Sequence, residues 1–358
     1  MAMTTTPPPW ENPLRHASTA MVCTIDTLAT RTGVDILAAG GNAVDASIAA
    51  NAVLTVTSQH MCGLGGDLFA LVHTGPGRPD CLNASGRAGS GADPAALLAE
   101  GFTAMPHRGD IRSVPVPGCV DGWWALHRRF GSMPLADLVA PAILLADHGF
   151  AASPLLAAVA GDVRDVHGAQ DFAGLTSAGT VVRRPGVARV LRAFAEGGRA
   201  AVYLGDFGEQ LLSAGTGEFT DEDLATPNAD WVDPLGVRVW GHDVWTVPPN
   251  SQGYLALAAA RIAEGLDLPG EEDPLRPAPL REKGELSLAR GTHLDHQVLG
   301  IFIGLEQRQG HPEAVVEALG SRGYREVRTQ DVLEKFFCRR LPHAAGDRRH
   351  LEAQPTAV

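Results

Sequence analysis

The chain has 358 residues, of which 45% are hydrophobic, enough to fill the core of one large domain or two ordinary ones and to exclude disorder over most of its length. Its 41 glycines and 25 prolines show no collagen-like period, so they indicate many tight turns rather than a fibre. The 41 acidic residues outnumber 29 basic ones, and the resulting net charge of -12 would repel a polyanion. We therefore expect a small-molecule partner and no nucleic acid.

Neither an export signal nor a membrane span is visible in the sequence. Residues 1–18 hold no apolar stretch long enough for a signal-peptide core, and no run of about 18 apolar residues occurs anywhere. An odd number of cysteines without C-x-x-C spacing indicates reduced thiols in a chain of this size. We expect a cytoplasmic protein that makes no membrane contact. The cysteines are Cys23, Cys62, Cys81, Cys119 and Cys338.

Composition changes near residue 270. Most of the acid excess lies before that point, and lysine occurs only after it, at Lys283 and Lys335. The proline-rich stretch there cannot continue a helix or join a central strand. The predicted divisions are a disordered arm over 1–17, a main domain over 18–270, a linker over 271–284, a small domain over 285–340 and a disordered tail over 341–358.

Two helices are predicted near the start of the main domain. The first covers 30–39 and is stopped by Gly40 and Gly41, because glycine readily adopts the positive φ that a helix C-terminus commonly needs. Asn42 is a good N-cap for the second, an Ala-rich helix over 46–57 whose small side chains allow close packing. We expect this second helix to be buried.

A glycine-rich loop over 59–67 follows, and it leads into the continuous apolar run 68–72, which predicts a buried strand. Further on, a strand is predicted over 243–247, before a turn at 248–253. The remaining predicted helices cover 122–130, 135–148, 187–196, 207–214 and 254–264.

Seven short stretches occur in a characteristic order: Gly40–Ala46, Met61–Phe69, Gly86–Arg87, Val116–Gly118, Tyr203–Gly205, Phe219–Leu224 and Pro248–Gly253. Together they resemble the large-chain portion of the γ-glutamyltransferase family of N-terminal-nucleophile hydrolases, over about residues 18–270. The resemblance implies an α+β fold with αββα layers, helix-rich in the large-chain part and incomplete here. It also implies cleavage or transfer of γ-glutamyl or similar acyl groups.

Arg87 is the substrate-binding candidate. The family uses an arginine after this strand to hold the substrate's α-carboxylate, so the resemblance implies that role for Arg87. A planar guanidinium gives a bidentate, charge-assisted grip that lysine cannot copy. Without the resemblance, the residues indicate a surface arginine in the Gly/Ser-rich loop 85–91. We expect Arg87 to face a pocket lined by residues 63–67.

The glycine-rich loop is a candidate ligand loop, through Gly63, Gly65, Gly66 and Asp67. Glycines allow a backbone to approach a ligand closely, but a structural turn is the alternative interpretation. The spacing is not the G-x-G-x-x-G dinucleotide fingerprint and no P-loop lysine follows, so we expect no nucleotide cofactor.

No metal site is expected either. His293 and His296 have helix-like spacing with Asp295 between them, but no third ligand cluster stands nearby in the sequence. His60 and His148 are interpreted as partners of helix C-terminal dipoles rather than catalytic bases.

Thr292 is the catalytic candidate. The family's nucleophile is a threonine freed by self-cleavage, whose own α-amine serves as base. Arg290–Leu294 is the nearest match to that motif, and the alternative is that the match is coincidental, because no paired-glycine motif follows it. We therefore predict that the chain stays uncleaved and lacks the small catalytic chain, as a truncated or frame-disrupted family member would.

The last part of the chain resembles the amino-acid-sensing, ACT-like domain of biosynthetic threonine dehydratases. A strand over 298–306, a helix over 311–321, a strand over 323–327 and an amphipathic segment over 331–337 would make half of a ferredoxin-like unit.

Two classes of function stay open. The first is a γ-glutamyltransferase or related amidohydrolase that acts on a small γ-glutamyl or acyl-amide substrate. The second is a non-catalytic protein that binds an amino acid or carboxylate. In either case the partner could be a second copy of the chain or a missing small chain.

Overall fold

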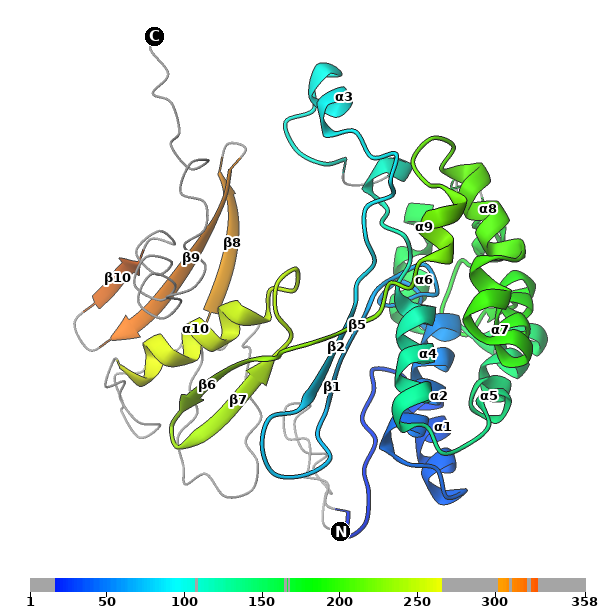
Figure 1. The fold of residues 1–358 in the computed structure, drawn as a ribbon, viewed down its shortest axis with the longest axis horizontal. Helices are drawn as coiled ribbons and strands as arrows, with labels where there is room; N and C mark the ends of the chain where they lie inside the picture. Colours follow the sequence, from blue (N-terminus) through cyan, green and yellow to red (C-terminus); the bar gives the residue numbers. More distant parts are fainter. Residues whose placement is uncertain are drawn as a thin grey trace, which may run out of the picture. The chain divides into compact units, whose positions relative to one another are not determined.

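The structure is a computed structural model, which describes residues 17–106, 109–163, 166, 168–265, 302–308, 311–320 and 323–327 (Figure 1). The chain divides into two compact units, residues 1–72 with 80–232 and residues 73–79 with 233–358. The predicted boundaries next to the arm and the linker stay predictions, because residues 1–16 and 266–301 lie outside the described ones.

Two helices open the first unit: α1 (Thr27–Ala38) and α2 (Ala43–Thr57). Both were predicted, and each begins three residues earlier than expected. Asn42 caps α2 as predicted, since its side chain accepts from the N–H groups of Val44 and Asp45 at 2.8 and 3.0 Å. The Asp45 carboxylate accepts in return from the Asn42 N–H at 3.0 Å, which completes a capping box. Most of α2 is buried, as its small residues predicted.

The three-stranded sheet of this unit has the order β1-β2-β5 and is antiparallel throughout. Its strands are β1 (Leu68–Val72), β2 (Asp80–Ala84) and β5 (Asp230–Val232). The central strand β2 therefore pairs with a strand about 150 residues further along the chain. This long-range pairing brings the end of β2 beside the start of β5.

The strand predicted over 68–72 is confirmed, but the prediction that it is buried is wrong. Leu68, Ala70 and Val72 pack against the core, whereas Leu71 on the other face is 40% exposed. Successive side chains of a strand point to opposite faces, so a run of apolar residues can still expose one of its two faces.

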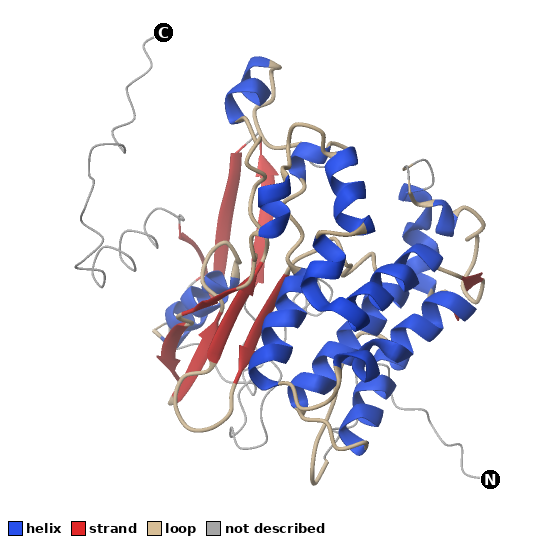
Figure 2. Ribbon diagram, turned by 45° about the vertical axis from the view of Figure 1, so that its right-hand side comes forward, coloured by secondary structure: helices blue, strands red, loops and turns tan. Residues whose placement is uncertain are grey.

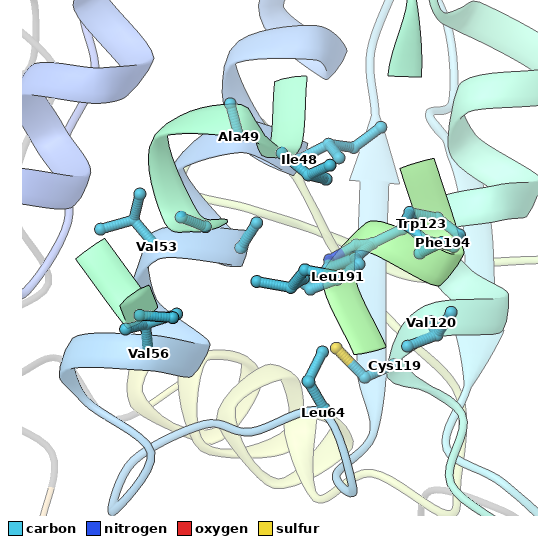
Figure 3. Close-up of a cluster of buried hydrophobic side chains, with 14 of the residues drawn as sticks. Ile48, Ala49, Val53, Val56, Leu64, Cys119, Val120, Trp123, Leu191 and Phe194 are labelled. Atoms are coloured by element: carbon cyan, nitrogen blue, oxygen red, sulfur yellow. The ribbon is translucent and has the colours of Figure 1, made fainter. Parts of the chain in front are cut away.

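Helices cover one face of this sheet (Figure 2). The main ones besides α2 are α4 (Cys119–Phe130), α5 (Leu135–His148) and α7 (Pro185–Tyr203). Trp123 and Phe194 meet in the core with ring centroids 5.7 Å apart, among small and aliphatic side chains (Figure 3). The helix predicted over 135–148 is confirmed at both ends, and those predicted over 122–130 and 187–196 form parts of α4 and α7.

The helix predicted over 207–214 is α8 (Asp206–Ala214). None of the helices in the described ranges has the length and apolar character needed to cross a membrane. Shorter elements complete this unit: α3 (Pro94–Ala99), η1 (Ile111–Ser113), β3 (Phe150–Ala151), α6 (Pro154–Val159), η2 (Ala160–Val163), η3 (Gln170–Phe172), β4 (Val181–Val182) and α9 (Asp221–Ala225).

The second unit contains a hairpin of β6 (Leu235–Val239) and β7 (His242–Thr246), followed by α10 (Gly253–Glu264). The strand and the helix predicted here are confirmed, with β7 one residue earlier than expected. Trp240 at the hairpin turn has a φ of 48°, and its N–H donates to a Glu264 carboxylate oxygen at 2.6 Å.

A three-stranded antiparallel sheet also belongs to this unit, in the order β10-β9-β8. Its strands are β8 (Phe302–Arg308), β9 (His311–Gly320) and β10 (Gly323–Val327). The helix predicted over 311–321 is therefore wrong. The backbone of β9 pairs with a strand on each side, and its adjacent β-branched valines favour extended structure over a short helix. The ACT-like resemblance stays a prediction.

Candidate functional site

Arg87 lies just beyond β2, on a backbone that is held at close range. Gly86 has a φ of 85°, and a Cβ at this position would collide with the carbonyl oxygen of Val116. The Val116 N–H donates to the Arg87 carbonyl at 2.8 Å. The stretches around 86–87 and 116–118, both singled out by the sequence, therefore lie side by side, and glycine is required for that approach.

The chain after Arg87 is held just as closely. A Cβ on Gly89 would collide with the carbonyl oxygen of Glu218. Ser90 donates to the Asp223 carboxylate through both its N–H and its hydroxyl, each at 2.9 Å. Burial raises the pKa of Asp223, but hydrogen bonds from Ser90 and Thr220 outweigh it and leave that pKa below its usual value. The loop that carries Arg87 is thus fixed on both sides.

The glycine-rich loop over 59–67 hydrogen-bonds to the N-terminus of α4. The Gly66 carbonyl accepts from the N–H groups of Gly118 and Cys119, both at 3.0 Å. Gly118 has no side chain to cap the helix, and a Cβ there would collide with the Ala84 carbonyl oxygen. The Gly66 carbonyl thereby satisfies helix donors that otherwise have no intrahelical partner. This arrangement favours the structural-turn interpretation for Gly66, while ligand contacts by Gly63, Gly65 and Asp67 stay predictions.

The Arg87 guanidinium is bonded to residues 227–230. Its Nη1 donates to the Pro227 carbonyl at 2.6 Å and to Asn228 Oδ1 at 3.2 Å. Its Nη2 forms an ion pair with Asp230 Oδ2 at 2.6 Å. The side chains of Arg87 and Asp230 are 48% and 58% exposed. The prediction that Arg87 faces a pocket lined by residues 63–67 stays a prediction, and the structure adds a carboxylate and a carbonyl as partners of this guanidinium.

A buried ion pair anchors the segment that holds Arg87. Arg199 of α7 pairs with Asp121 of α4, and both side chains are buried. Arg199 Nη2 also donates to the carbonyls of Leu224 and Thr226, both at 2.7 Å. The second oxygen of Asp121 accepts from the N–H of Asn228 at 2.9 Å. This pair ties two helices to residues 224–228.

Tyr203 extends this buried cluster to the 116–118 stretch. Its hydroxyl donates to the Pro117 carbonyl and accepts from the Asp121 N–H at 3.4 Å. Burial, followed by the nearby Asp121 charge, raises the pKa of Tyr203. The phenol is therefore a neutral hydrogen-bonding group. It connects Asp121, which holds residues 224–228 behind Arg87, to the 116–118 stretch that pairs with the Arg87 backbone.

Sequence reasoning missed Asp230, Asn228, Asp121 and Arg199. Asp230 and Arg87 are far apart in the chain and become neighbours only through the β2–β5 pairing. Asp121 directly precedes the helix predicted over 122–130, and this position gave no signal of an ion pair with an arginine on another helix.

The other candidate residues from the sequence are the threonine nucleophile and the histidines. Thr292, His293 and His296 lie outside the described residues. Within the described ranges, no group of three or more His, Cys, Asp or Glu side chains could hold a metal ion. His148 Nδ1 lies 3.2 Å from the Leu144 carbonyl, and burial lowers the pKa of His60.

The comparisons with known proteins agree on one family, by sequence and by fold. The family model of gamma-glutamyltranspeptidase matches residues 29–281. The glutathione hydrolase-like YwrD proenzyme of Bacillus subtilis is 34% identical over 265 residues, covering 69% of this chain and 49% of the relative. The acylase ACY 1 proenzyme of Pseudomonas sp. (strain V22) is 30% identical over 273 residues, covering 70% and 49%.

The solved structure of Helicobacter pylori gamma-glutamyltranspeptidase superimposes with a TM-score of 0.66 at 25% identity, covering 72% of this chain and 78% of that one. The predicted α+β, helix-rich fold of N-terminal-nucleophile hydrolase type is thereby confirmed. The chain spans about half the length of the curated relatives it matches. By sequence and by fold, this chain belongs to the gamma-glutamyltranspeptidase family.

Proposed function

We propose that this chain supplies the substrate-binding part of a reaction that hydrolyses or transfers a γ-glutamyl or related acyl-amide group. Arg87 holds the α-carboxylate of the substrate. The observation that carries this proposal is a half-exposed guanidinium on a loop whose backbone is fixed on both sides. The names of the relatives, a glutathione hydrolase-like proenzyme and an acylase, support a small substrate of this class.

The chemistry of the site agrees with a carboxylate ligand. A guanidinium offers five N–H donors in a planar fork that matches the two oxygens of a carboxylate. A hydrogen bond to a charged group contributes about 1.5 to 3 kcal/mol, and the partial exposure of Arg87 favours the lower end of this range. The fixed backbone limits the conformational entropy lost on binding.

Calorimetry with L-glutamate tests the role of Arg87. Arg87→Ala should weaken binding by roughly tenfold, the equivalent of about 1.4 kcal/mol. Arg87→Lys should recover only part of the loss, because it restores the charge but not the fork. Arg78→Ala removes an arginine whose partner is Asp233 and serves as the matched control. Equal affinities of the wild type and Arg87→Ala would overturn the proposal.

Thr292 stays the candidate nucleophile within this proposal. Hydrolysis of a γ-glutamyl anilide by the wild type and by Thr292→Ala measures its contribution, and intact-mass spectrometry shows whether the chain divides between Gly291 and Thr292. A rate that vanishes in the variant, with division at this bond, supports a working nucleophile. Equal rates and one undivided mass support the alternative, a protein that binds the carboxylate without catalysis.

Three finer predictions accompany the proposal: a cytoplasmic location, a truncated family member, and partnership with a second copy or with a separate small chain. The four described cysteines are unbonded thiols, which agrees with a reducing compartment. Size-exclusion chromatography with light scattering distinguishes a single chain from an assembly.

A further inference from the structure

The guanidinium of Arg87 already holds a carboxylate, that of Asp230. Their contact at 2.6 Å is charge-assisted, and both side chains are about half exposed. The other terminal nitrogen, Nη1, donates to the Pro227 carbonyl and to Asn228 Oδ1. The Nη groups therefore carry the contacts to Asp230, Pro227 and Asn228.

Any bidentate ligand must share a nitrogen with Asp230. A carboxylate can bind two N–H groups of a guanidinium either across Nη1 and Nη2 or across Nε and Nη2. Both arrangements include Nη2, the atom that Asp230 holds. A ligand carboxylate therefore lies near a second negative charge, and like charges at this separation repel.

Replacement of the Asp230 carboxylate by a ligand carboxylate on Arg87 needs only side chains to move. The Arg87 backbone is fixed by Gly86 and Val116, and Asp230 lies in β5, in register with Asn83 of β2. An exposed ion pair of this kind is weak, so a ligand can displace it without disturbing the fold.

We infer that Asp230 is a built-in competitor that holds Arg87 when the site is empty and lowers its affinity for carboxylate ligands. This inference rests on the proposed function of Arg87. Asp230 then sets the affinity of the site without contacting the ligand. It also keeps the guanidinium ordered while no ligand is bound.

Calorimetry with L-glutamate tests the inference on the full chain. Asp230→Asn keeps the shape of the side chain and removes its charge, and it should tighten binding by about two- to fivefold, the range set by one exposed charge pair. Asp233→Asn makes the same change in charge on the carboxylate that pairs with Arg78, and its affinity should match the wild type. Adding Arg87→Ala to Asp230→Asn should abolish the gain.

A second ligand shows which carboxylate is involved. The α-amide of L-glutamate keeps the γ-carboxylate, so Asp230→Asn should leave its binding unchanged. Unchanged or weaker L-glutamate binding by Asp230→Asn, together with a loss in Arg87→Ala, overturns this inference and leaves the proposed function standing. Equal binding by the wild type and Arg87→Ala, or no binding by any variant, overturns both.

Discussion

Replacement of Arg199 by methionine should remove a large part of the stability of the first unit. The guanidinium is buried, contacts an equally buried Asp121 carboxylate and donates to two carbonyls. Arg199→Met leaves that carboxylate with the Asn228 N–H as its remaining strong donor and leaves the two carbonyls without their donor. Breaking a buried pair from one side costs about 3 to 5 kcal/mol.

Urea unfolding of the wild type and the variant, followed by circular dichroism, measures this loss as a change in the free energy of unfolding. Arg192→Met on the same helix is the matched control. Arg192 pairs with Asp147 at a far more exposed position, where such a pair contributes about 0.2 to 1 kcal/mol. The two variants should therefore differ by at least about 2 kcal/mol.

The double variant Asp121→Asn with Arg199→Met separates the pair from its parts. Removing both charges should cost less than the sum of the single changes, because no unpaired charge then stays buried. If Arg199→Met loses no more stability than Arg192→Met, the assignment of this pair as the anchor of residues 224–228 is refuted.

Three further variants test local features by thermal or urea unfolding. Burial raises the pKa of Asp45, but hydrogen bonds from Ser132 and from the α2 N-terminus outweigh it and lower that pKa. Asp45→Asn should therefore lower the free energy of unfolding by about 1 to 3 kcal/mol at pH 7, and by progressively less as the pH falls below about 4. A loss of stability that does not depend on pH would contradict this. Trp240→Asn should stabilise the hairpin by about 0.5 to 1 kcal/mol, because asparagine tolerates positive φ better than tryptophan, and a lower melting temperature would argue against the turn. Gly118→Ala should destabilise by more than about 2 kcal/mol, since its Cβ would meet the Ala84 carbonyl, and a neutral effect would contradict this close approach.

Local elements of the fold could be predicted from local patterns. The cap at Asn42 and the Ala-rich run after it define α2, and the apolar periodicity of 135–148 defines α5 at both ends. The order of seven short motifs was enough to predict the family, which the comparisons confirm. These features depend on neighbours within a few residues, and such signals can be read along the chain.

The support of the site could not be predicted, because it depends on contacts over long separations. Arg87 meets Asp230 only after β2 has paired with β5, and Arg199 meets Asp121 only after two helices have packed. The same limit explains the error at 311–321, where pairing with two neighbouring strands outweighs a local helical pattern.

Different residues fix the backbone around Arg87 and pair with its guanidinium. Glycine close contacts and the buried Arg199 pair fix the backbone around the guanidinium, so variants there should change stability and ligand binding together. The Asp230 carboxylate pairs with the exposed Arg87 side chain, so removal of its charge should change affinity while stability changes by less than about 1 kcal/mol. If Asp230 is a competing carboxylate, its replacement should change ligand affinity and leave stability almost unchanged. If it is a structural partner of Arg87, its replacement should change both. Measuring stability and affinity on the same Asp230→Asn protein therefore distinguishes the two roles directly.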